Sequence, residues 1–169
     1  MLYDYYRAAD RDAATIGPEF GRAVAEHLPG EPVFDAVDAK GIDPGVRLGK
    51  LIGLIRGVSW SVELTPSVSV YPPPEGVPQS EEEWESLPED SPYLEGPGIE
   101  ELPAAVRDTL ADVDDARIPE IAGQWAEIEE FTTYGVVDRE YLLTVAEELV
   151  GLARRAKDND QLLYCWLCP

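Results

Sequence analysis

The sequence predicts an α+β fold: a small mixed sheet, including strands from the N- and C-terminal ends of the chain, covered by about four to five helices. Two observations favour this class. Short segments near both ends and in the middle carry the alternating or continuous apolar pattern of strands, whereas the last third follows the helical period of about 3.6 residues. A chain of 169 residues can bury a sizeable core, so we expect a single domain over residues 1–169.

The N-terminal segment Leu2–Ala8 is rich in tyrosine and is expected to form a strand inside the sheet, because aromatic side chains would cover both of its faces. Asp10 or Asp12 is a suitable N-cap for a short helix after this strand. A second helix is expected over residues 18–28, where apolar residues recur every four positions.

The clearest helix start in the chain is at Asp43, an N-cap residue followed by Pro44 at the first helical position. The helix is expected to cover residues 44–56 and to end at Gly57. With Lys40, this helix forms the most basic part of the protein. Glycines recur along it every four residues and predict a smooth groove that a sheet or a neighbouring helix approaches closely: Gly45, Gly49, Gly53 and Gly57.

Residues 58–64 alternate between apolar and polar side chains and predict a strand with one buried face, and Val68 and Val70 repeat the pattern. Residues 72–98 follow as an acidic, proline-rich surface loop. One helical turn is expected within the loop, because Ser80 and Glu83 have the spacing of a capping box.

Three helices are expected in the last third of the chain, over residues 103–113, 119–131 and 138–157, and Asp138 is the N-cap of the longest. Residues 161–168 are nearly all apolar and predict a final strand. Because chain termini often lie close together, we expect the first and last strands to be neighbours in the sheet.

Charge is distributed unevenly. The net charge is −21, and between Glu75 and Glu101 the chain has ten acidic residues and no Lys or Arg. Such a field repels nucleic acid and anionic membranes and attracts basic protein surfaces. No apolar run is long enough for a membrane span, and the start lacks the pattern of a signal peptide, so a cytoplasmic location without nucleic-acid or membrane partners is expected.

The motifs that resemble catalytic or metal sites are incomplete. Cys165 and Cys168 have Cys-x-x-Cys spacing, but on a strand they would face opposite sides, so we interpret them as reduced core cysteines. His27 is the single histidine and lies beside no partner motif. Residues 112–123 lack the Gly and Glu of a calcium loop, and residues 127–130 fit a solvated helix face. We therefore expect no metal, no cofactor and no catalytic residue of a known type.

Three stretches resemble small uncharacterised acidic proteins of high-GC actinobacteria: Phe34-Asp-Ala-Val-Asp-Ala-Lys-Gly-Ile-Asp-Pro44, Leu110-Ala-Asp-Val-Asp-Asp-Ala-Arg-Ile-Pro119, and Leu152-Ala-Arg-Arg-Ala156 with Leu163-Tyr-Cys-Trp166. The order of a tyrosine-rich first strand, a helix in mid-chain and a final helix leading to a last strand is similar to the YfbM-like family of unknown function. This resemblance implies no activity, cofactor or catalytic residue.

The main functional hypothesis is a non-enzymatic binding module whose acidic loop engages a basic protein partner, as an inhibitor or a toxin-neutralising protein does. The residues expected to contact that partner lie in the loop: Glu81, Glu82, Glu83, Trp84, Glu85, Glu89 and Asp90. The acidity also has a simpler explanation, which is solubility alone.

The alternative is an enzyme of unrecognised type, with a pocket where the loop at residues 72–98 meets the sheet. Aromatic side chains would line this pocket, and burial would raise the pKa of Glu63 or of a loop carboxylate beside them. The candidate aromatics are Trp60, Tyr71, Trp84 and Tyr93.

Overall fold

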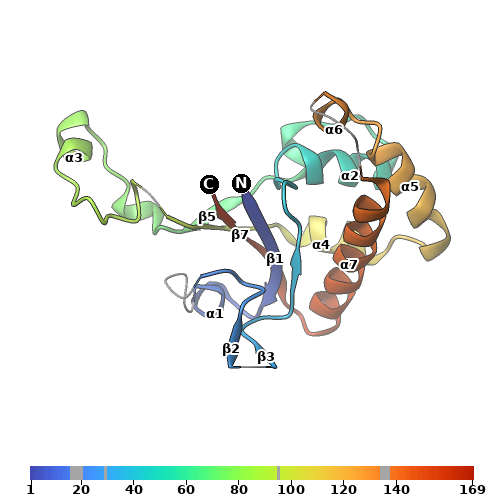
Figure 1. Cartoon of the computed structure of the whole chain (residues 1–169), viewed down its shortest axis with the longest axis horizontal. Coiled ribbons are helices and arrows are strands. Elements are labelled where there is room, and N and C mark those ends of the chain that lie inside the picture. Colours follow the sequence, from blue (N-terminus) through green and yellow to red (C-terminus); the bar gives the residue numbers. More distant parts are fainter. Residues whose placement is uncertain (16–20, 29, 95, 134–137) are drawn as a thin grey trace.

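The computed structural model describes residues 1–15, 21–28, 30–94, 96–133 and 138–169. In these residues the α+β class is confirmed (Figure 1). The strands are β1 (Leu2–Ala8), β2 (Glu26–Leu28), β3 (Glu31–Pro32), β4 (Ala36–Asp38), β5 (Val68–Tyr71), β6 (Gly98–Glu101) and β7 (Leu162–Cys168). The α-helices are α1 (Arg11–Ala14), α2 (Arg47–Arg56), α3 (Glu81–Glu85), α4 (Ala104–Ala111), α5 (Ile118–Trp125), α6 (Glu129–Thr132) and α7 (Arg139–Asp158), and short 3-10 helices cover Val62–Leu64, Pro74–Gly76 and Asp115–Arg117.

The main sheet of the described chain has five strands in the order β4-β1-β7-β6-β5. The first and last strands are neighbours, as predicted: β1 pairs with β7 along its whole length, from Leu2 opposite Cys168 to Ala8 opposite Leu162. The expected mixed sheet is instead antiparallel at every described pairing. Helices α4 to α7 connect β6 to β7 and bring the chain back so that β7 runs antiparallel to β6. This connection is therefore not the crossover that a parallel pair of strands needs.

Helices α2, α4, α5 and α7 cover one face of the sheet, as the sequence predicted (Figure 1). The side chains of β1 alternate between the two faces, so Tyr3 and Tyr5 pack against the helices while Tyr6 points to the opposite face. The other helices of the described chain, α1, α3 and α6, have only four or five residues each, which is why the total exceeds the expected number.

The opposite face of the sheet has a second, smaller core. Tyr6, Tyr164 and Trp166 lie in this core with Ala14 of α1, and Phe34 packs on Tyr6 with ring centroids 4.5 Å apart. The carboxylate of Asp4 is fully buried here and forms an ion pair with Arg22, which also contacts Asp38. These contacts fasten the segment after α1 onto the sheet.

The helix predicted over residues 18–28 is wrong for its described part, residues 21–28. Glu26–Leu28 forms β2, which pairs with Glu31–Pro32 across a turn in which Gly30 has a φ of 84°. Burial of Ala23 and the ion pair of Arg22 fix a turn at residues 22–25, in which the N–H of Ala25 donates to the carbonyl of Arg22, so tertiary contacts override the weak helical pattern. His27 belongs to β2, and its side chain lies outside the described part of the chain.

The strand predicted over residues 58–64 is also wrong. This segment is irregular and ends in the 3-10 helix Val62–Leu64, with Val58 and Val62 exposed. It crosses the glycine groove of α2, where Trp60 lies on Gly49 and the carbonyl of Val58 approaches Gly53. The groove therefore permits the predicted close approach, but the neighbour is the chain that follows the helix instead of a sheet or another helix.

Helix α2 begins at Arg47, three residues later than predicted, because residues 44–46 form a turn in which Asp43 Oδ1 accepts the N–H of Val46 at 2.6 Å. It ends as predicted at Gly57, whose φ of 66° lies in the left-handed region. The predicted cap of α7 is confirmed, since Asp138 accepts the N–H of Tyr141 at 2.9 Å.

Gly49→Ala is expected to lower the free energy of unfolding by about 1–3 kcal/mol, because overpacking outweighs the gain in helix propensity. A Cβ at this position would lie 2.8 Å from Trp60 Nε1 and 3.0 Å from Thr65 Oγ1. Gly123→Ala on α5 is the control: its Cβ would meet no atom within 4 Å, and we expect a gain of about 0.5–1 kcal/mol. Urea unfolding followed by circular dichroism measures both, and stabilisation by both would show that the groove tolerates a side chain.

Candidate functional site

The acidic loop, residues 72–98, forms an arm that projects away from the body of the protein between β5 and β6 (Figure 1). Helix α3 lies at its far end. The two strands at its base are paired antiparallel, with Tyr71 opposite Ile99, so the chain leaves and re-enters the sheet at neighbouring positions. We call residues 72–98 the acidic arm.

Contacts within the acidic arm give it a defined shape. Ser80 caps α3 by accepting the N–H of Glu83 at 3.3 Å, and the carboxylate of Glu83 accepts the N–H of Gln79 at 2.6 Å. The predicted helical turn is therefore present. Nearer the base, the hydroxyl of Tyr93 donates to the carbonyl of Pro73 at 2.7 Å, and its ring lies against Gly76. Tyr93 thus joins the outgoing and returning halves of the arm.

The residues predicted to contact a basic partner are all exposed on the acidic arm: Glu81, Glu82, Glu83, Trp84, Glu85, Glu89 and Asp90. Trp84 lies on the same short helix as four of these acids and is 41% exposed. Val77 and Leu94 are exposed on the same arm. The arm therefore presents negative charge together with apolar contact area.

The aromatic residues predicted to line an enzyme pocket are not brought together. Trp60 packs on α2, whereas Trp84 belongs to α3 at the opposite end of the molecule (Figure 1). Tyr71 ends β5, and Tyr93 is engaged with Pro73 within the arm. Glu63 is exposed.

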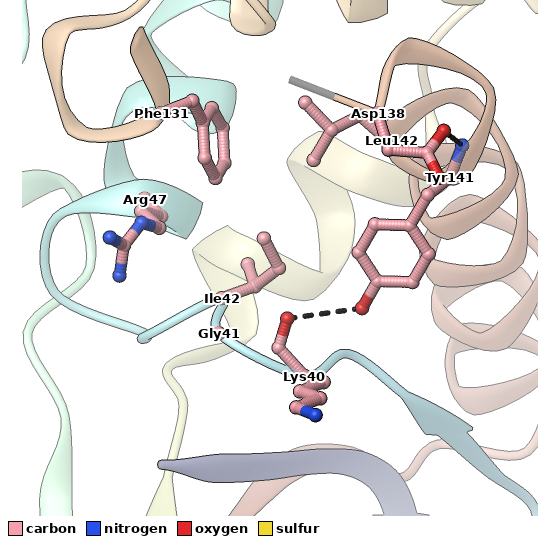
Figure 2. A pocket seen from close by; sticks show the side chains of 8 residues that line it. All are labelled: Lys40, Gly41, Ile42, Arg47, Phe131, Asp138, Tyr141 and Leu142. Carbon is pink, nitrogen blue, oxygen red and sulfur yellow. Dashed lines mark hydrogen bonds between the residues drawn. The ribbon is translucent and has the colours of Figure 1, made fainter. Parts of the chain in front are cut away.

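The structure shows a pocket that the sequence analysis missed, between the segment before α2 and the facing ends of α6 and α7 (Figure 2). Its volume is about 230 Å³. Its lining includes the apolar side chains of Ile42, Phe131 and Leu142, with Arg47 on one side and Asp138 and Tyr141 on the other (Figure 2). Lys40 and Gly41 complete the lining.

The backbone of residues 40–47 is held in place by side-chain donors from distant parts of the chain. Carbonyl oxygens of this segment accept from Tyr141 Oη, at 3.1 Å, from Tyr5 Oη, at 2.8 Å, and from Trp125 Nε1, at 2.8 Å. The acceptors are Lys40, Ile42 and Arg47, respectively. A fourth carbonyl, that of Gly45, accepts from Trp60 Nε1 at 3.1 Å. An irregular segment fixed at four carbonyls gives the pocket preformed walls.

Arg47 is one of two cations among the described residues that line this pocket, together with Lys40. Its guanidinium lies over the ring of Phe131, 5.5 Å from the centroid, and makes two long contacts, 3.2 Å to the carbonyl of Glu130 and 3.5 Å to Asp43 Oδ2. Its Nε is buried and has no hydrogen-bond partner among the described residues. A buried N–H without an acceptor is costly, and the guanidinium that carries this one points away from the other residues that line the pocket (Figure 2).

Tyr141 lies on the side of the pocket opposite Arg47, with its hydroxyl directed at the carbonyl of Lys40 (Figure 2), and is half-buried. Burial raises its pKa to about 12, and the nearby carboxylate of Asp38 adds to the rise. The phenol is therefore protonated at neutral pH, and its hydroxyl remains a donor to the Lys40 carbonyl. Tyr141 is a positioning group and not a base at neutral pH.

The two cysteines lie on opposite faces of β7, as predicted: Cys165 packs against the helices and Cys168 against the second core. Both thiols are free, and burial raises the pKa of Cys165 well above its usual range. The described residues contain no group of three His, Cys, Asp or Glu side chains arranged to hold a metal ion. Asp114 caps a 3-10 turn, which agrees with the structural interpretation of the calcium-like stretch.

The acids near Trp125, interpreted as a solvated helix face, are partly engaged. Glu130 forms an ion pair with Lys50 of α2 that lowers the pKa of its carboxyl, and Glu127 pairs with Arg139. The basic character of the α2 region was the signal in the sequence closest to the pocket. This signal indicated Lys40 and helix α2, but it did not indicate the apolar residues that complete the pocket.

No protein-family model matches this chain, and no curated protein or solved structure is significantly similar to it. None of the helices in the described ranges is long and apolar enough to cross a membrane.

Proposed function

We propose that the protein is a non-enzymatic binding module that engages a basic protein partner through its acidic arm, in the manner of an inhibitor or a toxin-neutralising protein. One observation carries the proposal. The arm projects away from the body (Figure 1), and the acids Glu81, Glu82, Glu83, Glu85, Glu89 and Asp90 on it are exposed together with the side chain of Trp84.

Electrostatics and apolar contact have different roles in this proposal. Exposed carboxylates attract a basic surface over a distance of roughly 10 Å at moderate salt, which accelerates association. Trp84 supplies the kind of large aromatic anchor that contributes strongly to affinity once it is desolvated. The net charge of −21 also opposes association of two copies of this chain through the arm, so a partner of opposite charge is favoured.

Reversing four charges, Glu81, Glu82, Glu83 and Glu85 to Lys, is expected to weaken capture of basic proteins at low salt by roughly tenfold or more, because each exposed pair contributes up to about 1 kcal/mol. Folding should be unaffected, since these side chains are exposed. Proteins retained from cytosol by immobilised wild-type protein and released by salt are identified, and their Kd is then measured for each variant.

The matched control reverses four exposed acids on α5 and α7, Glu120, Glu147, Glu148 and Asp158 to Lys, which changes the net charge equally. It should bind as the wild type does. If both variants lost the same affinity, the effect would be explained by net charge alone. If the arm variant bound as the wild type does, the acidic arm would be excluded as the binding site.

A further inference from the structure

We propose that the groove between strand β4 and helix α7 binds an extended, basic peptide segment of another protein, which pairs with β4 as a further strand of the sheet. The groove has a volume of about 330 Å³ and is lined by Ala36, Val37, Glu147, Glu148, Gly151 and Arg155. The proposal does not depend on the acidic arm, which leaves the sheet at the opposite edge, between β5 and β6 (Figure 1).

Strand β4 has an unpaired backbone edge. It is an outer strand, with β1 as its neighbour in the described sheet. The carbonyl of Asp35 and the N–H of Ala39 form hydrogen bonds with β1, at 3.3 and 2.9 Å. Because polar groups alternate in direction along a strand, the N–H and C=O groups of Ala36 and Asp38 point away from β1, and the described residues supply no partner for them. Such an edge is what a peptide recognises when it adds a strand to a sheet.

Two side chains of α7 hold the helix beside β4 and leave a gap between their contacts. Near the start of the helix, Tyr141 Oη donates to the carbonyl of Lys40 at 3.1 Å. Near its end, the guanidinium of Arg155 donates to both carboxylate oxygens of Asp35, at 2.7 and 2.8 Å. Helix and strand therefore run in opposite directions, with the groove between the two contacts. About five strand residues, or roughly 17 Å, separate these contacts, which is the length of an ordinary strand.

Small residues on both walls let a backbone approach β4. Ala36 lies on the strand and Gly151 on the helix. A Cβ at position 151 would lie 3.2 Å from Arg155 Nη1, so a larger residue would crowd the side chain that closes this end of the groove. The groove therefore offers space for a main chain beside β4 and is held open before the peptide binds, which lowers the cost of binding.

The charge of the groove favours a basic peptide. Glu147 and Glu148 are exposed and form no ion pair with any described residue. Arg155 is already bound to Asp35, which Arg7 also contacts. These groups comprise three carboxylates and two guanidinium groups, so one negative charge is left over. Lysine or arginine side chains on the α7 side of an added strand would lie beside the two glutamates and balance this charge.

A second copy of this chain is the other partner that an open strand edge could take, and charge opposes it. Asp38 on the edge shares Arg22 with the buried carboxylate of Asp4, so the edge itself carries a further excess of negative charge. Pairing two β4 edges would bring these acids together in a protein whose net charge is −21. A basic segment of a different protein is therefore favoured over self-association.

The probe is the peptide acetyl-Lys-Val-Lys-Val-Lys amide, in which the lysines face α7 when the valines pair with Ala36 and Asp38. Titration of the ¹⁵N-labelled full chain, followed by ¹H–¹⁵N spectra, should shift the amide signals of these two residues. At saturation their hydrogen exchange should slow at least tenfold, because both amides gain an acceptor. The same peptide with N-methylated valines, and the peptide with glutamate in place of lysine, should each bind at least tenfold more weakly.

Protein variants test the charge and the edge separately. Glu147→Gln combined with Glu148→Gln should weaken the lysine peptide roughly fivefold or more. The matched control, Glu63→Gln combined with Glu120→Gln, removes two exposed acids outside the groove and should leave the affinity unchanged. Ala36→Pro removes an outward N–H but no hydrogen bond to β1, so it should keep the fold and weaken the peptide at least tenfold.

Equal binding of the N-methylated peptide would overturn strand pairing, and equal binding of the glutamate peptide would overturn the selection of a basic segment. Shifts confined to the acidic arm would also exclude the groove. Sedimentation of the free protein as a dimer with its β4 amides already protected would show that a second copy occupies the edge, against the proposal. Should Ala36→Pro fail to fold, the N-methylated peptide still decides.

The groove and the acidic arm can fail independently of each other. The charge-reversed control for the arm contains Glu147→Lys and Glu148→Lys, so it should lose the lysine peptide and still bind the partner of the arm. The arm variant should show the reverse. Loss of both ligands in both variants would assign the binding to net charge and overturn the groove as a distinct site.

Discussion

Removal of residues 163–169 is expected to unfold the whole domain. Strand β7 lies between β1 and β6 and pairs with both, so its loss divides the sheet. Four consecutive side chains are almost fully buried, two against the helices and two in the second core: Leu163, Tyr164, Cys165 and Trp166. At about 1.5–3 kcal/mol for each large apolar side chain, their burial alone approaches the total stability of about 5–15 kcal/mol of an ordinary domain.

Circular dichroism and thermal melting measure this outcome. The truncated chain should show no cooperative transition, while removal of Pro169 alone, which lies beyond β7 and is exposed, should leave the melting temperature nearly unchanged. A truncated protein with the melting behaviour of the intact one would show that the sheet does not depend on its C-terminal strand.

The sequence predicted the elements that carry local signals. Asp138 with the long apolar stripe after it defined α7, and Ser80 with Glu83 defined the turn of α3, because caps act between residues close in sequence. The tyrosines of β1 predicted a strand inside the sheet, because only a strand that is covered on both faces buries aromatic side chains on both faces. For these elements the local sequence pattern and the fold require the same structure.

The errors arose where distant contacts decide the local structure. Val58 and Val62 alternate as in a strand, yet both are exposed, and the path of their segment is set by Trp60 on the glycines of α2. The segment before β2 follows the buried ion pair of Arg22 with Asp4, two residues that no local pattern connects. Periodicity describes which residues suit a strand or a helix but not which surface will receive them.

The two candidate sites differ in the same way. The acidic arm is a run of charge and proline in one stretch of sequence, so composition alone indicated it. The pocket gathers Ile42, Arg47, Phe131 and Tyr141 from three separate segments, and its backbone is fixed by carbonyl acceptors that every residue possesses. The sequence does not show which backbone carbonyl will accept a hydrogen bond from Trp125. This part of the pocket can therefore be identified only from the fold.

Trp125→Ala is the core substitution expected to cost most, about 3–5 kcal/mol in the free energy of unfolding, because it leaves a large cavity. Trp125 is fully buried, packs edge-on against Phe131 with centroids 5.4 Å apart, and donates to the carbonyl of Arg47. Its loss removes support from both sides of the pocket, so the backbone of residues 40–47 should also become more mobile. Chemical unfolding measures the first effect, and amide hydrogen exchange in residues 40–47 measures the second.

Trp125→Phe separates packing from hydrogen bonding. It keeps an aromatic ring beside Phe131 but leaves the Arg47 carbonyl without the indole donor, a loss of about 1–3 kcal/mol including the smaller ring. If Trp125→Phe were as unstable as Trp125→Ala, the hydrogen bond to residues 40–47 would dominate over packing. If instead Trp125→Ala unfolded like the wild type, this tryptophan would not join α5 to the segment before α2, and the preformed walls of the pocket would need another support.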